Sequence, residues 1–355
     1  MTQRQQEKGR LSNNPSLKDV AEKWLSSIEV PQVVVDENGN MVPVDGTEEI
    51  RRQTWDQYES IVHRLIEPNL GALKIKEITT STCDRFLRSL VVDGKGRTNA
   101  RLAKTVLKQI MSYAVRHDLY IWGNPVVEVD RLRKPRKEPQ GLSETTLEEV
   151  RKAVRNWGLE PGRSGPRPTS ILADIVDVLL GTGARIGEVL AIRLEDIDLS
   201  GDVGKVAITG TLVEPRHGPK YRQDLLKNPG SERIIPVPGF VVDVLVRRIS
   251  ESLANNAAGA LFWSRRGTYM QGSSVRRQLR AALDAAGIEN AQLITPHAFR
   301  RTVATLLARE VEDKAAASML GHADLTMTHA AYIQRLNEVD DHTAVLDGLA
   351  PKPLS

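Results

Sequence analysis

The chain has 355 residues, of which 40% are hydrophobic and 26% charged; this is a globular composition, and the length predicts two domains. No apolar run approaches the ~20 residues of a membrane span, residues 1–10 lack the apolar core of a secretion signal, and one cysteine cannot form an internal disulfide. These features exclude a membrane protein and a disulfide-stabilised secreted domain, and they favour the cytoplasm.

Positive charge is concentrated in one part of the chain. Residues 1–140 carry 23 Lys and Arg against 19 Asp and Glu, whereas residues 141–355 carry 26 of each. Residues 84–137 alone hold 13 basic and 5 acidic side chains. Such a segment favours a polyanionic partner, with nucleic acid the first candidate, although a solvated charged surface has the same composition.

A polar tail at 1–16 precedes the first predicted domain, residues 17–130, in which apolar residues recur at helical spacing. The pattern predicts four helices, at residues 17–29, 49–66, 80–92 and 98–117. Between the first two, residues 31–47 break the helical pattern and predict a small hairpin or an ordered loop. Cys83 has apolar neighbours one helical turn away, which indicates a small buried side chain rather than a nucleophile.

Two basic segments near the end of this domain are candidates for DNA contact. The first is a stripe along one side of the helix at 98–117, consisting of Arg97, Arg101, Lys104 and Lys108. The second is a predicted extended linker at 131–141, whose basic residues are Arg131, Arg133, Lys134, Arg136 and Lys137. Lys and Arg laid along phosphates displace condensed counterions. A solvated helix face and an ordinary charged linker are the alternatives.

The second predicted domain spans residues 142–340 and is followed by a tail at 341–355. Ser143 is a candidate N-cap for its first helix, and a strongly apolar helix at 169–181 is its predicted centre. Further helices are predicted at 240–254, 273–286, 296–309, 312–320 and 327–338. Alternating β-branched residues predict strands, at 203–213 and 233–237. The fold class is therefore mainly α with a small antiparallel β-sheet.

A glycine-containing turn at 181–184 leads to Arg185 and Glu188, which lie one helical turn apart. The carboxylate of Glu188 can hold the guanidinium of Arg185 while other N–H groups of that guanidinium face a ligand. Such a pair by itself is also a common surface ion pair.

His297 and Arg300 fall in the first turn of a predicted helix, with Thr295 as its N-cap and Pro296 at its first position. Free N–H groups and partial positive charge at a helix N-terminus favour an anion. A histidine satisfied by local hydrogen bonds and a solvated arginine would give the same motif.

Five motifs occur in a fixed order: Ala-Arg-Ile-Gly-Glu at 184–188, a Lys–Ser–Arg hairpin at 227–233, Pro-His-Ala-Phe-Arg-Arg at 296–301, Leu-Gly-His at 320–322, and Tyr332. None is specific alone, but together they resemble the tyrosine recombinases, the phage-integrase-type site-specific recombinases. The resemblance covers residues 142–340 as the catalytic domain. The preceding helices are similar to the all-helical core-DNA-binding domain of that family.

The resemblance implies the catalytic side chains: Tyr332 as nucleophile, Arg185 and Arg300 on the scissile phosphate, His297 and His322 as assisting histidines, and Glu188 as support for the first arginine. Two guanidiniums give charge-assisted hydrogen bonds to the non-bridging oxygens of a phosphate. A phosphotyrosine stores the energy of the broken bond, so the enzyme is expected to need no metal, ATP or other cofactor.

The general acid for the departing 5′-oxygen is expected to be a lysine. Lys227 resembles the lysine of the family's hairpin, which precedes a Ser-x-Arg strand start. Lys220 lies in the same long segment and is the second candidate. A mobile loop lysine on a phosphate is the alternative for either residue.

The best interpretation is an integrase-like recombinase that cleaves and rejoins DNA through a 3′-phosphotyrosine and serves integration or excision of a mobile element. The resemblance implies a homotetramer on double-stranded core sites with inverted half-sites, in which residues 333–355 dock onto neighbouring protomers. Accessory DNA-bending or directionality proteins and a bacterial or phage-encoded, nucleoid-associated enzyme fit this interpretation. A type IB topoisomerase-like enzyme and an idle DNA-binding regulator are the alternatives. Because about 16 residues precede the first helix, no arm-site-binding domain is expected.

Overall fold

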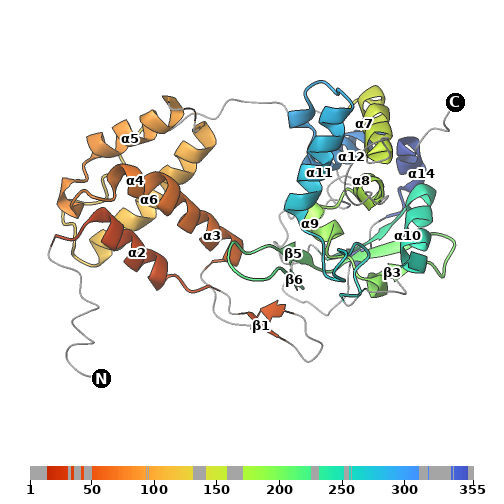
Figure 1. Cartoon of the computed structure of the whole chain (residues 1–355), viewed down its shortest axis with the longest axis horizontal. Coiled ribbons are helices and arrows are strands. Elements are labelled where there is room, and N and C mark those ends of the chain that lie inside the picture. Colours follow the sequence, from red (N-terminus) through yellow and green to blue (C-terminus); the bar gives the residue numbers. More distant parts are fainter. Residues whose placement is uncertain are drawn as a thin grey trace. The chain divides into compact units, whose positions relative to one another are not determined.

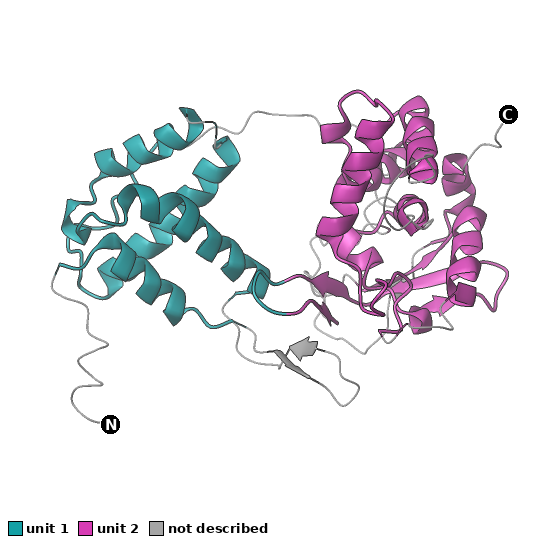
Figure 2. Cartoon of the chain, in the orientation of Figure 1, with its two compact units in different colours: residues 1–33, 43–137, 215–218 teal, residues 34–42, 138–214, 219–355 magenta. Residues whose placement is uncertain are grey.

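The computed structural model describes residues 14–30, 33–35, 41–43, 50–92, 94, 96–130, 141–157, 171–224, 232–251, 256, 258–311, 319, 337–338 and 340–350. The chain divides into two compact units (Figure 2), the first made of residues 1–33, 43–137 and 215–218 and the second of residues 34–42, 138–214 and 219–355. Several predicted features lie outside the described residues: the polar tail up to residue 13, the basic linker at 131–140, Lys227, His322, Tyr332, and nearly all of the helices predicted at 312–320 and 327–338.

The first unit is helical. Its elements are α2 (Leu17–Ser27), α3 (Arg52–Ile61), the π-helical turn η1 (Val62–Ile66), α4 (Glu67–Leu70), the 3-10 turn η2 (Ile75–Glu77), α5 (Thr80–Val92) and α6 (Arg97–Arg116). The four predicted helices are confirmed, with the second one divided into α3 and η1. Ser16 begins α2 by accepting the backbone N–H of Asp19 at 3.2 Å, a local reason for the helix to start there.

Helix α6 forms the centre of this unit and packs against α2, α3 and α5. Its buried side is the apolar side read from the sequence and includes Val106, Leu107, Ile110 and Met111, all 0% exposed. Cys83 is also fully buried, and burial raises the pKa of its thiol to about 11. The prediction that Cys83 is a packing residue is therefore confirmed.

Strands β1 (Val33–Val35) and β2 (Met41–Pro43) pair as a two-stranded sheet. The hairpin predicted between the first two helices is therefore present. Across the part of the chain that the structure describes, helices are too short or too polar to cross a bilayer.

The second unit surrounds one apolar helix (Figure 1). Its helical elements are α7 (Glu144–Asn156), α8 (Ile171–Thr182), α9 (Ile186–Val189), η3 (Leu194–Asp196), α10 (Gly239–Glu251), α11 (Gly272–Ala285), η4 (Ala291–Leu293), α12 (Pro296–Glu310), α14 (Thr343–Leu346) and η5 (Asp347–Leu349). Every residue from 172 to 182 is buried, and α7, α10, α11, α12 and α14 all contact α8. The predicted central helix is thus confirmed, as is Ser143 as the N-cap of α7, where its hydroxyl accepts the N–H of Thr146 at 3.2 Å.

Two small sheets complete this unit. Their strands are β3 (Ile197–Asp198), β4 (Lys205–Ile208), β5 (Thr211–Val213), β6 (Tyr221–Gln223), β7 (Arg233–Pro236) and β8 (Asn337–Glu338). One sheet has the order β3-β4-β7-β8, and the other is the hairpin β5-β6. Strands β4 and β7 are antiparallel, with the buried residues Val206 and Ile235 opposite each other, so the predicted antiparallel sheet is confirmed.

Two details of the strand prediction are wrong. The single strand expected at 203–213 is divided at residues 209–210, where the chain passes from the larger sheet into the hairpin. The last two residues of the helix expected at 327–338 form a strand instead, because β8 pairs parallel to β7, Asn337 opposite Arg233. Pairing with a sheet edge outweighs the local helical pattern there.

Candidate active site

The turn between α8 and α9 brings two arginines close together. Gly183 has a φ of +60°, a left-handed conformation that glycine adopts without steric cost. Its carbonyl oxygen consequently accepts Nη1 of Arg300, from the start of α12, at 2.8 Å. Arg185 follows at the N-cap of α9. The glycine turn therefore joins the two arginines that the sequence singled out.

Glu188 organises the arginines from a buried position, with only 3% of its surface exposed. Its Oε1 accepts Nη1 of Arg185 at 2.7 Å, and its Oε2 accepts the backbone N–H of Arg185 at 2.9 Å. Its Oε2 also accepts Nη2 of Arg233 at 3.0 Å. Burial alone would raise the pKa of Glu188, but Arg233 and Arg185 outweigh burial and hold this pKa below its ordinary value. Glu188 is thus a carboxylate shared by two guanidiniums.

Arg233 is a functional candidate that the sequence reasoning left without a role. It begins β7, is 2% exposed, and donates from Nε to the carbonyl oxygen of Met319 at 2.8 Å. Burial lowers its pKa, and Glu188 opposes that effect. The available signal was a charged residue at the start of an otherwise apolar strand, which requires a buried partner.

Arg300 is also buried, with 3% of its surface exposed. Burial and the charge of Arg185 lower its pKa to about 10, although Glu188 opposes both effects. At neutral pH its guanidinium therefore carries a full charge. Together Arg185, Arg233 and Arg300 bring three positive charges to one carboxylate, and the side chain of Arg185 remains 36% exposed. Such an excess of buried positive charge attracts an anion from solution.

His297 stands beside this cluster as the second residue of α12. Its side chain is exposed, yet partial desolvation and the charges of Arg301, Arg300 and Arg185 lower its pKa. At neutral pH the imidazole is consequently neutral and able to accept a proton. Thr295 is the N-cap of α12 and Pro296 its first residue, as predicted, although the side chain of Thr295 makes no capping hydrogen bond.

Lys220 immediately precedes β6 and is half-buried. Burial lowers the pKa of its ammonium group, Glu214 opposes this effect, and Arg266 adds to it. Glu214 is held in turn by the backbone N–H of Gly272 at 2.5 Å and the hydroxyl of Ser273 at 3.1 Å. The second candidate for the general acid is therefore a lysine that gives up its proton more readily than an exposed one.

The basic stripe on α6 separates into two kinds of cation. Arg97, Arg101 and Lys108 are exposed. Lys104 is half-buried, and its ammonium donates to the carbonyl oxygens of Val129 at 2.5 Å and Asp130 at 3.3 Å. Lys104 thus binds backbone carbonyl groups of its own unit, a role that the helical spacing did not reveal.

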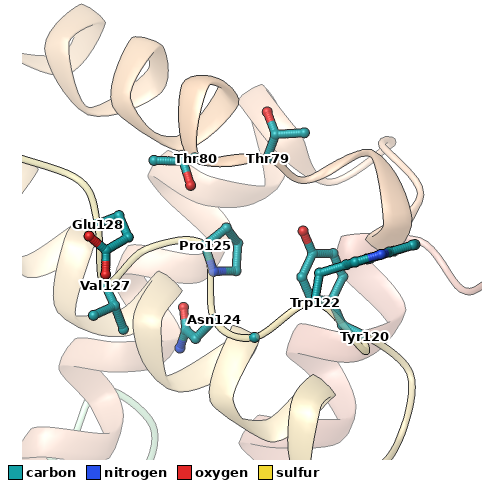
Figure 3. A pocket seen from close by; sticks show the side chains of 9 residues that line it. Thr79, Thr80, Tyr120, Trp122, Asn124, Pro125, Val127 and Glu128 are labelled. Atoms are coloured by element: carbon teal, nitrogen blue, oxygen red, sulfur yellow. The ribbon is translucent and has the colours of Figure 1, made fainter.

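A pocket of about 510 Å³ lies on the first unit (Figure 3). Thr79, Thr80, Tyr120 and Trp122 contribute to its walls, and none of the predicted catalytic side chains does so. The hydroxyl of Tyr120 donates to the carbonyl oxygen of Ile78 at 2.8 Å, while Trp122 is 64% exposed. The sequence did not single out this surface.

Comparison with known protein families gives two matches. The model of the Phage integrase family matches residues 145–338, and that of the phage integrase N-terminal SAM-like domain matches residues 46–91. The first match includes Arg185, Glu188, Arg233, His297 and Arg300, the residues that meet in the second unit.

Individual proteins give the same result. The integrase of Staphylococcus phage L54a is 23% identical over 308 residues, which cover 81% of this chain and 84% of that integrase. The XerC-like tyrosine recombinase of Caldanaerobacter subterraneus is 24% identical over 303 residues, with 79% and 73% of the two chains covered. A lambda integrase tetramer bound to a Holliday junction has a similar fold, with a TM-score of 0.61, 18% identity, and 91% and 82% covered.

Proposed function

Because the chain belongs to the phage integrase family, the tyrosine recombinases, we propose that it is a site-specific recombinase that cleaves and rejoins DNA through a 3′-phosphotyrosine. The observation that carries this proposal is the arginine cluster: Arg185 and Arg233 share the carboxylate of Glu188, and Arg300, bound to the carbonyl oxygen of Gly183, lies within the electrostatic reach of the same carboxylate. An excess of guanidinium over carboxylate is suited to a phosphate that gains negative charge in the transition state.

In the proposed reaction Arg185 and Arg300 bind the non-bridging oxygens of the scissile phosphate, and Glu188 and Arg233 hold them in place. The phenolic oxygen of Tyr332 attacks phosphorus and forms a covalent bond, while the bond to the 5′-oxygen breaks. His297 and His322 assist by hydrogen bonding and proton transfer, and Lys227, or else Lys220, protonates the departing 5′-oxygen. Attack by a 5′-hydroxyl from another duplex reverses these steps, so that no metal or ATP is consumed.

We assign DNA binding to residues 17–130, together with the basic linker 131–141, and catalysis to residues 142–340. The fold shared with a lambda integrase tetramer on a Holliday junction supports a homotetramer acting on two duplex core sites. Integration or excision of a mobile element is the reaction we favour, since one relative is a phage integrase. We expect the enzyme to act at the nucleoid, with accessory DNA-bending proteins as candidate partners.

The test is covalent trapping. A duplex carrying the site, taken from the junctions that flank the gene, is nicked near the cleavage point so that cleavage becomes irreversible. We expect the wild-type chain to form an SDS-resistant adduct and Tyr332→Phe to bind the same DNA without forming it. Tyr113→Phe, on α6 in the first unit, is the matched control and should form the adduct normally.

An adduct with Tyr332→Phe would assign the nucleophile to another residue. A strand-exchange assay on paired sites then separates recombinase from topoisomerase, because only the recombinase requires two sites. Relaxation of supercoiled DNA without exchange would contradict the proposal, and binding without any adduct in the wild-type chain would indicate an idle regulator.

A further inference from the structure

Both candidates for the general acid, Lys220 and Lys227, lie close in sequence to the hairpin formed by β5 and β6. Lys220 immediately precedes β6, and Lys227 comes four residues after its end. The two strands form a sheet of their own, with Leu212 opposite Arg222. A two-stranded ribbon is marginally stable by itself and takes its orientation from what it packs against. The contacts that anchor this hairpin therefore bear on the position of the lysine.

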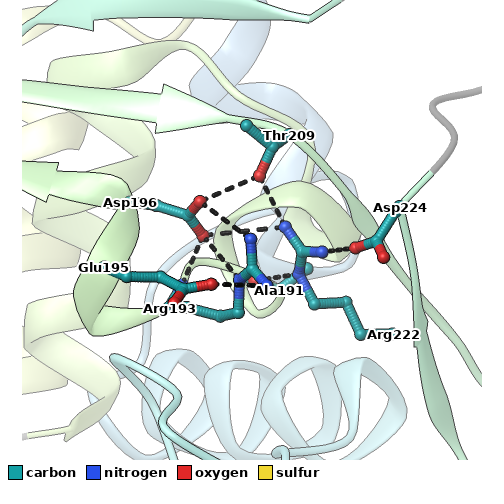
Figure 4. Close-up of polar contacts among 7 residues, drawn as sticks. All are labelled: Ala191, Arg193, Glu195, Asp196, Thr209, Arg222 and Asp224. Atoms are coloured by element: carbon teal, nitrogen blue, oxygen red, sulfur yellow. Dashed lines mark hydrogen bonds and ion pairs between the residues drawn. The ribbon is translucent and has the colours of Figure 1, made fainter.

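Leu212 anchors the hairpin by packing in the core of the unit, and one buried guanidinium makes several polar anchoring contacts (Figure 4). Arg222 in β6 is 8% exposed, and its Nε donates to the carbonyl oxygen of Ala191 at 2.9 Å. Its Nη2 donates to the hydroxyl of Thr209 at 2.5 Å and lies 3.6 Å from Oδ2 of Asp196, and its Nη1 pairs with Asp224. Ala191 stands three residues beyond Glu188 and two residues after the end of α9. Arg222 thus joins the hairpin to the turn that follows the arginine cluster.

The acceptors of Arg222 are themselves fixed. Asp196, 8% exposed, accepts the backbone N–H of Arg193 at 2.8 Å and the hydroxyl of Thr209 at 2.9 Å. Gly210 leaves room for the guanidinium, because a Cβ there would stand 2.6 Å from Cζ of Arg222. Burying a charge costs desolvation free energy, and an apolar side chain can often replace a buried ion pair without loss of stability. A guanidinium with this many directed contacts gives orientation rather than simple packing.

We propose that Arg222 is a positioning residue for the leaving-group step. Its guanidinium holds the lysine-bearing hairpin in register with the α9 turn, so that the general acid and the arginine cluster meet one phosphate together. This inference rests on the proposed function. A misplacement of about 1 Å at a reacting group can lower a rate about 100-fold, so a positioning residue has a measurable effect without touching DNA.

The test compares two leaving groups. A substrate with sulfur at the 5′-bridging position releases a thiolate that needs no proton, so it tolerates a misplaced general acid. We expect Arg222→Lys to cleave ordinary DNA about 10- to 100-fold more slowly and to cleave the sulfur substrate within about threefold of the wild-type rate. Arg193→Lys is the matched control. Arg193 also binds Asp196, but it lies at the N-cap of η3 and not in the hairpin. This variant should cleave both substrates normally.

Equal losses on the two substrates would show a merely structural role for Arg222 and overturn the inference, as would wild-type rates on both. If Arg222→Lys does not fold, as judged by thermal unfolding, Thr209→Val decides. This change removes one acceptor of Arg222 at nearly constant shape and should give a smaller, equally rescued defect. Failure of the proposed function is distinguishable, because the wild-type chain would then form no adduct with either substrate.

Discussion

Two of the arginine–carboxylate clusters in the second unit, those around Glu188 and Asp196, differ in charge balance. Around Glu188, Arg185 and Arg233 pair with one carboxylate, and the charge of Arg300 lies close enough to interact with it. Around Asp196, Arg193 and Arg222 meet three carboxylates, those of Asp196, Glu195 and Asp224. Exposure does not separate the clusters, since the side chain of Arg193 is 33% exposed and that of Arg185 36%. The first cluster, which we call unbalanced, has an excess of positive charge and attracts an anion. In the second, which we call balanced, the carboxylates outnumber the guanidiniums, so its cations are neutralised without a ligand.

The largest expected effect tests the unbalanced cluster. Arg300→Gln should lower adduct formation about 1,000-fold, because it removes a charged donor from the transition state. Since Arg300 lowers the pKa of His297, the same change should raise that pKa, as measured by the histidine's NMR titration. Arg193→Gln, in the balanced cluster, should leave adduct formation within about threefold of wild type. Equal losses in both variants would remove the distinction between the clusters.

Glu188→Gln should lower cleavage by about 10- to 100-fold, because an amide cannot hold two guanidiniums as a carboxylate does. It should also change the pH dependence of stability. The folded-state pKa of Glu188 lies below its ordinary value of 4.5, so its contribution is complete above that value and disappears as the pH falls through the folded-state pKa. Urea unfolding at pH 7 and at pH 3.5 should therefore show a smaller acid loss in the variant. An identical loss in both proteins would contradict the assignment.

On α6 in the first unit, too, cations with partners in the protein differ from exposed ones. Replacing Arg97, Arg101 and Lys108 with Ala should weaken binding to all DNA sequences. The slope of log affinity against log salt should become less steep by about 2 to 3, because each lost phosphate contact releases about one condensed counterion fewer. Lys104→Ala should lower thermal stability and leave the slope unchanged, because its ammonium already holds two carbonyl groups. A slope that responds only to Lys104 would reverse this assignment.

The smallest effect is expected at the rim of the balanced cluster. The side chains of Glu195 and Asp224 are 67% and 72% exposed, respectively. Glu195→Gln and Asp224→Asn should each change the free energy of unfolding by less than about 1 kcal/mol, as is usual for solvent-screened ion pairs. A much larger change, measured by urea titration, would show that the cluster depends on these carboxylates.

The sequence predicted best what depends on neighbours along the chain. Helix α8, the cap at Ser143 and the pairing of Arg185 with Glu188 all follow from spacings of a few residues. Long helices with strong apolar periodicity leave few alternatives, because one face must be buried. The match to the phage integrase family likewise follows from motifs that are each local.

Contacts between distant residues could not be predicted in this way. Arg233 reaches Met319 across 86 positions, and Arg222 reaches Ala191 across 31. Lys104 has the spacing of a DNA-facing residue, yet its partners are backbone carbonyl groups 25 and 26 residues away. Carbonyl acceptors have no side-chain signature, so a sequence pattern does not reveal which of them will meet a buried cation.

The shared acceptor at Glu188 has a consequence for how this sequence can change over time. Arg185 and Arg233 both donate to one carboxylate, so the effect of losing either guanidinium includes what happens to the other. The effects of substituting groups that share a partner are not additive. The losses of activity in the two single variants should therefore sum to more than the loss in the double variant. The effects of substitutions at these three positions therefore depend on one another. A lineage that loses one of these side chains also loses part of what the other two contribute.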